Sequence, residues 1–372
     1  MGGSRIYLDD AGSAPLLEDA RRARDRAPGG NPASPHAEGR AARAALDAAR
    51  DRAAAALGVP SRDLIFCSGG TEAVNLAVLG AGRRLPPGRS IVTWRSEHQS
   101  VLGAVRRLQL EGRPVRLLEV DGDGFADPTA IPDDAGLISL GLANNEVGTL
   151  QPVAEVALRA RELEALLHLD CCQGPRWVSP PMDLVDLASF SGHKLGAGSG
   201  GLLVARAEVR LEPLAYGGPQ EWGHRPGRED VPAATAIAAA LEVCAAEREA
   251  RSATVRPLAR RLREALAERG AQLTGGEPRL PNFATAVFPG QRGEDLLMWL
   301  DLAGIAASSG SACASGSLDP SHVLLAMGYS LEESLGSLRL TAGYETTAEE
   351  VDRAVEVLRR LPVGSSHATR RS

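Results

Sequence analysis

Short apolar runs alternate with amphipathic stretches along the first 205 residues of the chain. The apolar runs predict strands at 63–67, 90–94, 115–120, 137–143, 166–170, 185–190 and 202–205. The amphipathic stretches between them predict helices at 71–80, 99–111 and 152–163. Strands that are apolar along their whole length and are separated by helices are typical of a mostly parallel sheet covered on both faces. We therefore predict an α/β fold.

The pattern changes after a long alanine-rich helical stretch at 233–269. Strands are predicted at 285–288, 305–308 and 337–341, and helices at 294–303, 321–327 and 348–361, the last with a capping box of Thr347 and Glu350. These elements predict a smaller α+β domain. We expect a large domain at 1–249, a small C-terminal domain at 250–365 and a disordered tail at 366–372. We expect the N-terminal arm, 1–15, to pack on the small domain.

Composition and charge exclude several classes of protein. The chain is 44% hydrophobic and 24% charged, with a net charge of −6, so it lacks the basic face of a nucleic-acid-binding protein. No apolar run reaches the length of a membrane span, and the N-terminus lacks the apolar stretch of a secretory signal. Five cysteines without a paired framework indicate reduced thiols, and no metal-binding spacing occurs. We expect a cytoplasmic protein.

The chain contains a single lysine, Lys194, among 41 lysine and arginine residues. Arginine can replace lysine as a surface cation, but its guanidinium stays protonated and cannot form an imine. A lysine amine can form a Schiff base with an aldehyde cofactor. The lone lysine therefore favours covalent chemistry. The alternative is a drift towards arginine in which one lysine survives by chance.

Residues near Lys194 in the predicted sheet suit a pyridoxal cofactor. Asp170 ends a predicted strand, where a carboxylate can pair with a protonated pyridine nitrogen, and Gln173 follows within reach of a ring oxygen. The small residues of 67–71 lead into a helix whose N-terminal N–H groups suit a phosphate, and the Thr71 hydroxyl adds a donor. Each signal alone is weak, because strands often end in aspartate and Gly-Gly-Thr is often an ordinary cap.

Taken together, these segments resemble the cysteine desulfurases, within the fold-type I pyridoxal-phosphate enzymes of aminotransferase class V. The Ser-Gly-Ser-Ala-Cys form at 309–313, followed by Ser-Leu-Asp-Pro-Ser-His, resembles the long-loop group I enzymes. The resemblance runs nearly end to end, through motifs at 7–9, 30–36, 68–75, 96–98, 144–148, 151–152, 191–194, 217–221 and 308–313.

The resemblance implies a role for individual residues. Lys194 would bond covalently to the cofactor and carry protons, Arg339 would hold the substrate carboxylate, and Cys313 would be the nucleophile that takes sulfur from L-cysteine as a persulfide. His98 would stack on the cofactor ring and act as acid or base. The other residues implied to bind pyridoxal 5'-phosphate are Gly70, Thr71, Asn145, Asp170, Gln173, Ser191, His193 and Arg228, and Asn145 would also bind substrate. The products would be L-alanine and a persulfide for an acceptor protein, and the enzyme would be a homodimer.

Two segments depart from the family pattern. Arg228 stands where the family usually has a threonine that reaches the phosphate of the neighbouring subunit. It either binds that phosphate with more charge or the contact is lost. The glycine-rich stretch 195–201 is shorter than usual and lacks the expected Pro-Lys. The loop near the cofactor is therefore expected to differ in shape.

Other interpretations stay open at this point. Cys313 can be a small loop residue, Arg339 a partner in a surface ion pair, and His98 a residue that begins a helix. Cys171 and Cys172 are expected to point to opposite faces and to serve packing. The rival functions are another fold-type I enzyme, such as a selenocysteine lyase, and a degenerate non-catalytic partner in a sulfur-transfer complex.

Overall fold

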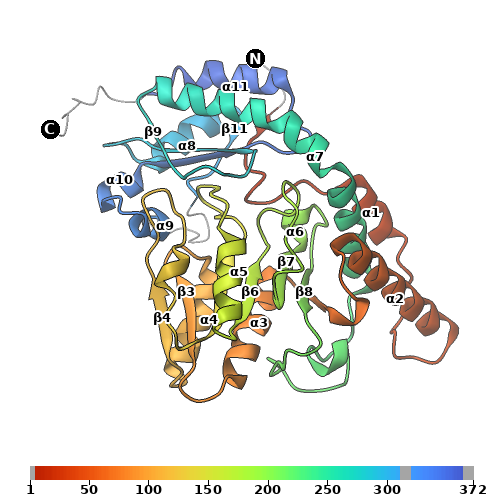
Figure 1. Cartoon of the computed structure of the whole chain (residues 1–372). Coiled ribbons are helices and arrows are strands. Elements are labelled where there is room, and N and C mark those ends of the chain that lie inside the picture. The colour runs from red at the N-terminus through yellow and green to blue at the C-terminus, as the bar shows by residue number, and fades with distance from the viewer. Residues whose placement is uncertain (1–4, 311–319, 363–372) are drawn as a thin grey trace.

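The structure is a computed structural model that describes residues 5–310 and 320–362 of the chain (Figure 1). Its larger part is built on a seven-stranded sheet with the strand order β2-β8-β7-β6-β5-β3-β4. The strands are β2 (Leu64–Cys67), β3 (Ser90–Trp94), β4 (Val115–Leu118), β5 (Ala135–Gly141), β6 (Leu166–Asp170), β7 (Leu187–Ser191) and β8 (Gly201–Ala205). Strands β4, β3, β5, β6 and β7 pair in parallel, and β8 pairs antiparallel with both β7 and β2.

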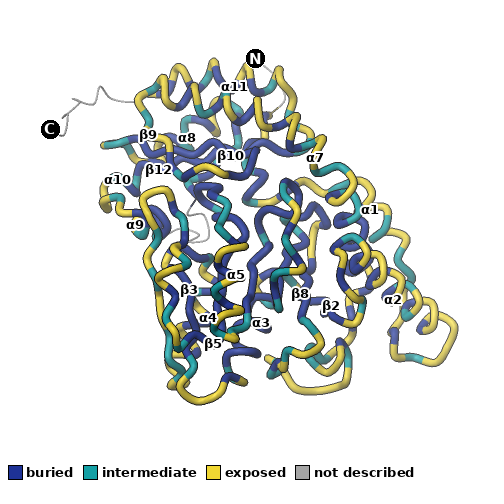
Figure 2. Tube along the Cα trace, in the orientation of Figure 1, coloured by how far each residue is buried: buried dark blue, intermediate teal, exposed yellow. Residues whose placement is uncertain are grey.

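Helices cover both faces of this sheet. On one face lie α3 (Gly70–Arg84) and α4 (Gln99–Leu110), whose apolar side chains share a core with residues of β2, β3 and β8. On the other face lie α2 (Ala37–Leu57), α5 (Val153–Glu162) and the first half of α7 (Val231–Glu268), around a second core. Apart from the edge strand β4, these strands are buried along nearly their whole length (Figure 2). Burial on both faces explains why the strands are apolar without alternation.

A smaller body lies above the carboxyl ends of the large sheet (Figure 1). Its antiparallel sheet has the order β12-β10-β9, formed by β9 (Gln272–Leu273), β10 (Phe283–Val287) and β12 (Ser337–Thr341). Helices α8 (Gly293–Leu302) and α11 (Ala348–Leu358) pack on it, and α9 (His322–Ala326) and α10 (Leu331–Leu335) lie at its edge. The larger body has a mostly parallel sheet and the smaller body has an antiparallel one. This arrangement confirms the predicted α/β fold with an α+β C-terminal part.

Two segments connect the bodies. The N-terminal strand β1 (Ile6–Tyr7) pairs in parallel with β11 (Ile305–Ala306), so the start of the chain lies in the small body. Helix α7 runs without interruption from the large core into the small one, where Val255, Leu258 and Leu262 are buried. The helix crosses the boundary predicted at 249/250, and that division stays a prediction. The predicted tail at 366–372 lies outside the described residues.

The sequence analysis missed several helices, chiefly α1 (Glu18–Asp25) and α2, which pack against α7. The buried positions of α2 are largely alanines, such as Ala42, Ala49 and Ala53. Alanine contrasts weakly with polar neighbours, so a helix buried through alanines shows little amphipathic pattern. The five-residue α10 was also missed. Among the residues that the structure describes, no helix is both long and apolar enough to cross a membrane.

Candidate active site

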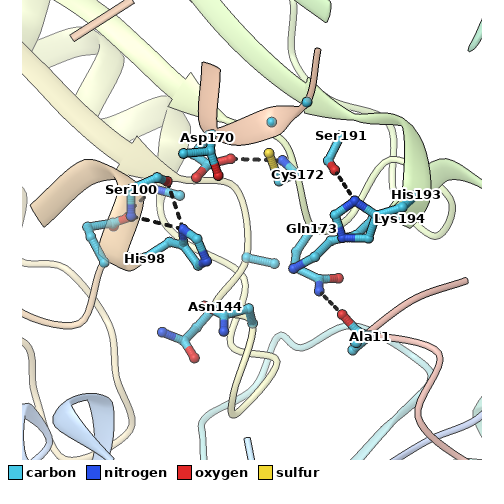
Figure 3. A pocket seen from close by; sticks show the side chains of 18 of the residues that line it. Ala11, His98, Ser100, Asn144, Asp170, Cys172, Gln173, Ser191, His193 and Lys194 are labelled. Carbon is cyan, nitrogen blue, oxygen red and sulfur yellow. Dashed lines mark hydrogen bonds between the residues drawn. The ribbon is translucent and has the colours of Figure 1, made fainter. Parts of the chain in front are cut away.

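A cavity of about 560 Å³ opens between the two bodies, at the carboxyl ends of the parallel strands. Ligands bind at this edge in open α/β sheets, where successive strands leave a crevice. The cavity brings together residues that are up to 328 positions apart, from Ala11 to Arg339. Figure 3 shows His98 on one side of the cavity and Gln173, His193 and Lys194 on the other.

The N-terminus of α3 forms one wall of the cavity. Ser68, Gly69, Gly70 and Thr71 line it. The first N–H groups of a helix have no partner within the helix and carry the positive end of its dipole, so this wall suits a phosphate. Gly70 is buried so tightly that a Cβ there would lie 2.6 Å from the Cys172 sulfur. The close approach of α3 to the strand ends therefore requires glycine at this position.

Lys194 is presented by a single helical turn directly after β7. The strand ends at Ser191, and α6 (Gly192–Leu195) ends at Gly196, which has a left-handed conformation. A Cβ on Gly192 would lie 2.0 Å from the Ser199 carbonyl oxygen, so the glycine-rich stretch folds back directly onto the start of the turn. His193 Nδ1 lies 2.8 Å from the Ser191 hydroxyl. Burial and the neighbouring Lys194 charge lower the pKa of His193.

Asp170, Cys172 and Gln173 follow the adjacent strand β6. The Cys172 N–H donates to Asp170 Oδ1 at 2.9 Å, which orients the carboxylate in the cavity wall. Gln173 Nε2 donates to the Ala11 carbonyl at 2.7 Å; this nitrogen carries two N–H donors, so the contact leaves one for a ligand. Cys171 is buried in the core behind the sheet, whereas Cys172 lines the cavity. Burial raises the pKa of both thiols.

His98 and Glu97 enter the cavity from the turn between β3 and α4. Glu97 is buried, and its Oε1 accepts the Gly141 N–H at 3.0 Å. Burial, together with the charge of Asp170, raises the pKa of Glu97 to about 8. Burial lowers the pKa of His98. The site therefore holds a neutral carboxylic acid and a neutral imidazole side by side near pH 7.

Arg339 reaches the cavity from β12 of the small body. Its Nη1 donates to the Asn145 carbonyl at 2.6 Å and its Nη2 pairs with Asp9 at 2.9 Å. The side chain is only 4% exposed, and its Nε has no hydrogen-bond partner among the described residues. A buried guanidinium with an unsatisfied N–H is suited to bind a carboxylate that enters the cavity.

Comparison with known proteins agrees with this geometry. The profile of the aminotransferase class-V family matches residues 6–354, which is nearly the whole chain. The chain belongs to this family. Enzymes of the family use pyridoxal phosphate, and their fold is the α/β fold described above. The predictions of family and enzyme class from the sequence are therefore confirmed.

Several similar proteins are named as cysteine desulfurases. The chain is 38% identical to the putative cysteine desulfurase IscS 1 of Bacillus subtilis, over 96% of this chain and 99% of the relative. It is 39% identical to the cysteine desulfurase IscS of Methanosarcina thermophila, over 95% and 91%. A solved NifS-like protein superposes with a TM-score of 0.88 at 31% identity, over 95% of this chain and 98% of that one. The chain is thus a class-V member of the cysteine desulfurase group.

The structure brings most of the residues predicted for the site into one cavity. Nine of them are Gly70, Thr71, His98, Asn145, Asp170, Gln173, Ser191, His193 and Lys194, and Arg339 joins them from the small body. Arg228 is exposed and does not line the cavity within this chain. Its predicted contact is with a neighbouring subunit, so it stays a prediction. Cys313 lies outside the described residues, three positions after Gly310, which lines the cavity.

Sequence reasoning missed three residues that shape the site. Glu97 was named only as part of a motif, and Ser100 and Asp9 were given no role of their own. Ser100 contacts His98, and Asp9 pairs with Arg339 across 330 positions. Cys172 was expected to serve packing, and the structure adds that it lines the cavity. The Ser100–His98 contact is a local contact at the start of a helix, which a capping pattern could have signalled, whereas the pairing of Asp9 with Arg339 depends on which elements meet in space.

Proposed function

We propose that the protein is a pyridoxal-phosphate-dependent cysteine desulfurase that converts L-cysteine to L-alanine and collects the sulfur on Cys313. The observation that carries the proposal is the convergence of the only lysine, Lys194, with Asp170 and Arg339 in one cavity between the two bodies. These three residues supply an amine, a carboxylate and a buried guanidinium, the groups that a pyridoxal enzyme needs for an amino-acid substrate.

The lining of the cavity fits the cofactor. The N-terminus of α3 with Thr71, together with Ser191 and His193, offers N–H and hydroxyl donors for its phosphate. Asp170 would pair with the ring nitrogen and Gln173 would donate to the ring hydroxyl. When bound, the cofactor withdraws electrons from the substrate carbon next to the amine. Lys194 would hold the cofactor and then move a proton between substrate carbons.

Transfer of sulfur from the substrate cysteine to Cys313 needs no external oxidant. The Cys313 thiolate attacks the sulfur of the bound cysteine, an S–S bond forms and the C–S bond of the substrate breaks. The electrons of that bond stay on the substrate carbon, which takes up protons to become alanine. Arg339 would hold the substrate carboxylate throughout, through its fork and the unsatisfied Nε. The persulfide then passes to an acceptor protein.

The proposal includes a homodimer and a cytoplasmic location. An exposed segment beside the cavity supports the dimer: Tyr216 and Trp222 are 80% and 57% exposed. Arg225 of the same segment pairs with Glu72 in the cavity wall at 3.1 Å. In a dimer, Arg228 would face the phosphate of the partner.

The four described cysteines are free thiols, which supports a reducing compartment.

The proposal is tested by giving the purified protein L-cysteine and a reducing thiol, and measuring alanine and sulfide together. We expect equal amounts of both, lost in Cys313→Ala and Cys313→Ser but kept in Cys244→Ala, which removes a thiol outside the cavity. Borohydride reduction followed by peptide mapping should place the cofactor on Lys194, the only lysine. A protein that binds the cofactor but forms alanine without Cys313 would contradict the persulfide route.

A further inference from the structure

The N-terminal arm contacts a residue of the site through its backbone. The Ala11 carbonyl accepts an N–H group of Gln173 Nε2 at 2.7 Å, as Figure 3 shows. A carbonyl oxygen can only accept, so this contact fixes the side-chain amide with its nitrogen towards the arm. Any residue at position 11 would supply such a carbonyl. The orientation of Gln173 therefore depends on the contacts that hold the arm in place.

A buried ion pair holds the arm at the preceding residue. Arg176 Nη1 lies 2.6 Å from Asp10 Oδ1, and the two side chains are 4% and 3% exposed. Arg176 follows Gln173 by three positions, in the loop after β6. Two neighbouring residues of the arm, Asp10 and Ala11, are thus joined to the same loop, one by its side chain and one by its carbonyl.

Aromatic rings from both bodies enclose this ion pair. Arg176 Cζ lies 4.0 Å from the centre of the Tyr344 ring and 5.4 Å from that of Trp177. The Tyr344 hydroxyl also donates to the Arg176 carbonyl at 2.7 Å. A Cβ on Gly343 would lie 2.8 Å from Asp10 Oδ1, so the carboxylate is tightly packed from the side of the small body. Contacts between a cation and a ring strengthen where water is excluded.

The enclosure makes the ion pair costly to open. A guanidinium stays protonated, so a buried arginine needs a negative partner. Separating the two members of a buried pair leaves each charge uncompensated in a poorly solvated site. The pair of Asp10 and Arg176 therefore keeps the arm and the loop after β6 together.

We propose that Asp10 and Arg176 are positioning residues: their ion pair holds the arm on the loop after β6, so that the Ala11 carbonyl fixes the amide of Gln173. One N–H group of the amide is used by that carbonyl, and the other is left for the cavity that Gln173 lines. The effect on cofactor binding rests on the proposed function, in which Gln173 donates to the ring hydroxyl. The hold on the arm does not rest on it.

Hydrogen exchange of the cofactor-free protein, followed by mass spectrometry, tests the hold on the arm. The Asp10 N–H donates to the Thr341 carbonyl and the Ala11 N–H to the Thr341 hydroxyl, so both report whether the arm is in place. Arg176→Met removes the cation but keeps an apolar side chain beside the rings. The fold can tolerate this change, because a buried Asp10 can take up a proton and become neutral.

We expect the peptide 8–13 to exchange about tenfold faster in Arg176→Met than in the wild type, while α3 exchanges at the wild-type rate. The matched control is Arg251→Met. Arg251 Cζ lies 5.0 Å from the centre of the same Tyr344 ring, but its ion pair is with Glu247, so the arm should exchange as in the wild type. Unchanged exchange of the arm in Arg176→Met, or equal acceleration in α3, would overturn the proposal.

Titration of the cofactor-free protein with pyridoxal 5'-phosphate tests the effect on Gln173. We expect the dissociation constant to rise about tenfold in Arg176→Met and to stay within about twofold in Arg251→Met. In a Gln173→Ala background, Arg176→Met should change it by less than about twofold, because the contact through which it acts is gone. A tenfold effect that persists in that background would contradict positioning through Gln173. If the wild-type protein binds no pyridoxal phosphate, the proposed function fails, and the exchange rates still decide whether the ion pair holds the arm.

Discussion

At the residue scale, the site depends on groups whose ordinary chemistry is changed by burial. Glu97 is the clearest case, because it is a buried carboxyl group close to Asp170. Two neighbouring negative charges in a poorly solvated site are unfavourable, so one of the two groups keeps its proton. A neutral Glu97 leaves Asp170 as the carboxylate that would pair with the ring nitrogen of the proposed cofactor.

The burial of Glu97 predicts how stability depends on pH. The pKa of Glu97 is raised to about 8 in the folded protein, against about 4.3 in an unfolded chain. Its stabilising effect is complete below about pH 4.3 and is lost as pH rises through about 8, by about 1.4 kcal/mol per pH unit. Glu97→Gln keeps the Gly141 contact but cannot ionise. We expect it to unfold at higher urea concentration than the wild type at pH 8, with a difference that shrinks towards pH 5.

The control for this measurement is Glu119→Gln, which changes an exposed glutamate in the same way. Its unfolding midpoint should follow the wild type at every pH. An unfolding midpoint of Glu97→Gln that also followed the wild type across this range would mean that Glu97 is ionised in the folded protein.

At the element scale, the position of α3 against the strand ends decides the shape of the proposed phosphate site. The helix begins at Gly70, where the backbone passes within contact distance of Cys172 and Ser191. Gly69, one residue earlier, faces open space, since a Cβ there would meet nothing within 4 Å. Adjacent glycines thus have different reasons to be glycine: Gly70 is required by packing, whereas Gly69 borders the space where a phosphate would bind.

This difference predicts that alanine destabilises the protein at position 70 but not at position 69. Gly70→Ala inserts a methyl group 2.6 Å from the Cys172 sulfur and 2.9 Å from Ser191 Cβ. We expect it to lower the free energy of unfolding of the cofactor-free protein by about 1–3 kcal/mol, as overpacking does. Gly69→Ala should leave that free energy within about 0.5 kcal/mol. Equal unfolding free energies for the two variants in urea titrations would contradict the tight contact at Gly70.

At the scale of the whole molecule, the site is assembled from both bodies and from the N-terminal arm. β1 pairs with β11 in the small body, and Asp9, just after it, pairs with Arg339. Arg339 also donates to the Asn145 carbonyl, at the edge of the large sheet. The guanidinium is thus held by two segments that are remote from β12 in sequence, and its orientation depends on how the two bodies sit together.

We expect Asp9→Asn to weaken substrate binding while it leaves the cofactor in place. Loss of the charged partner lets the Arg339 fork turn, so KM for L-cysteine should rise about tenfold, with the absorbance of the bound cofactor unchanged. The matched control is Asp301→Asn, which removes an exposed ion pair between the small body and Arg5 of the same arm. Similar KM values in the two variants would mean that the arm acts only through packing.

The amino-acid sequence by itself determined the elements and the chemistry. The bounds of β3, β6 and β12 follow directly from runs of apolar residues, because a strand buried on both faces needs them. The single lysine, the strand that ends in Asp170 and the small residues before α3 are each weak signals, and only together, in one predicted sheet, do they predict a pyridoxal enzyme. Helix α2 escaped this reasoning because its buried face is alanine.

Only the tertiary structure decided the states of the side chains in the site. The neutral form of Glu97, the partners of Arg339 and the contact of Gly70 with Cys172 depend on burial and on distances between segments far apart in the chain. The place of His98 shows the division most clearly. The sequence allowed both a helix-start residue and a catalytic residue, and the structure shows that the start of α4 and the cavity meet at this one side chain. Patterns in the sequence indicate which face of a helix or strand is buried. Which side chains meet at that face is decided by how the helices and strands pack.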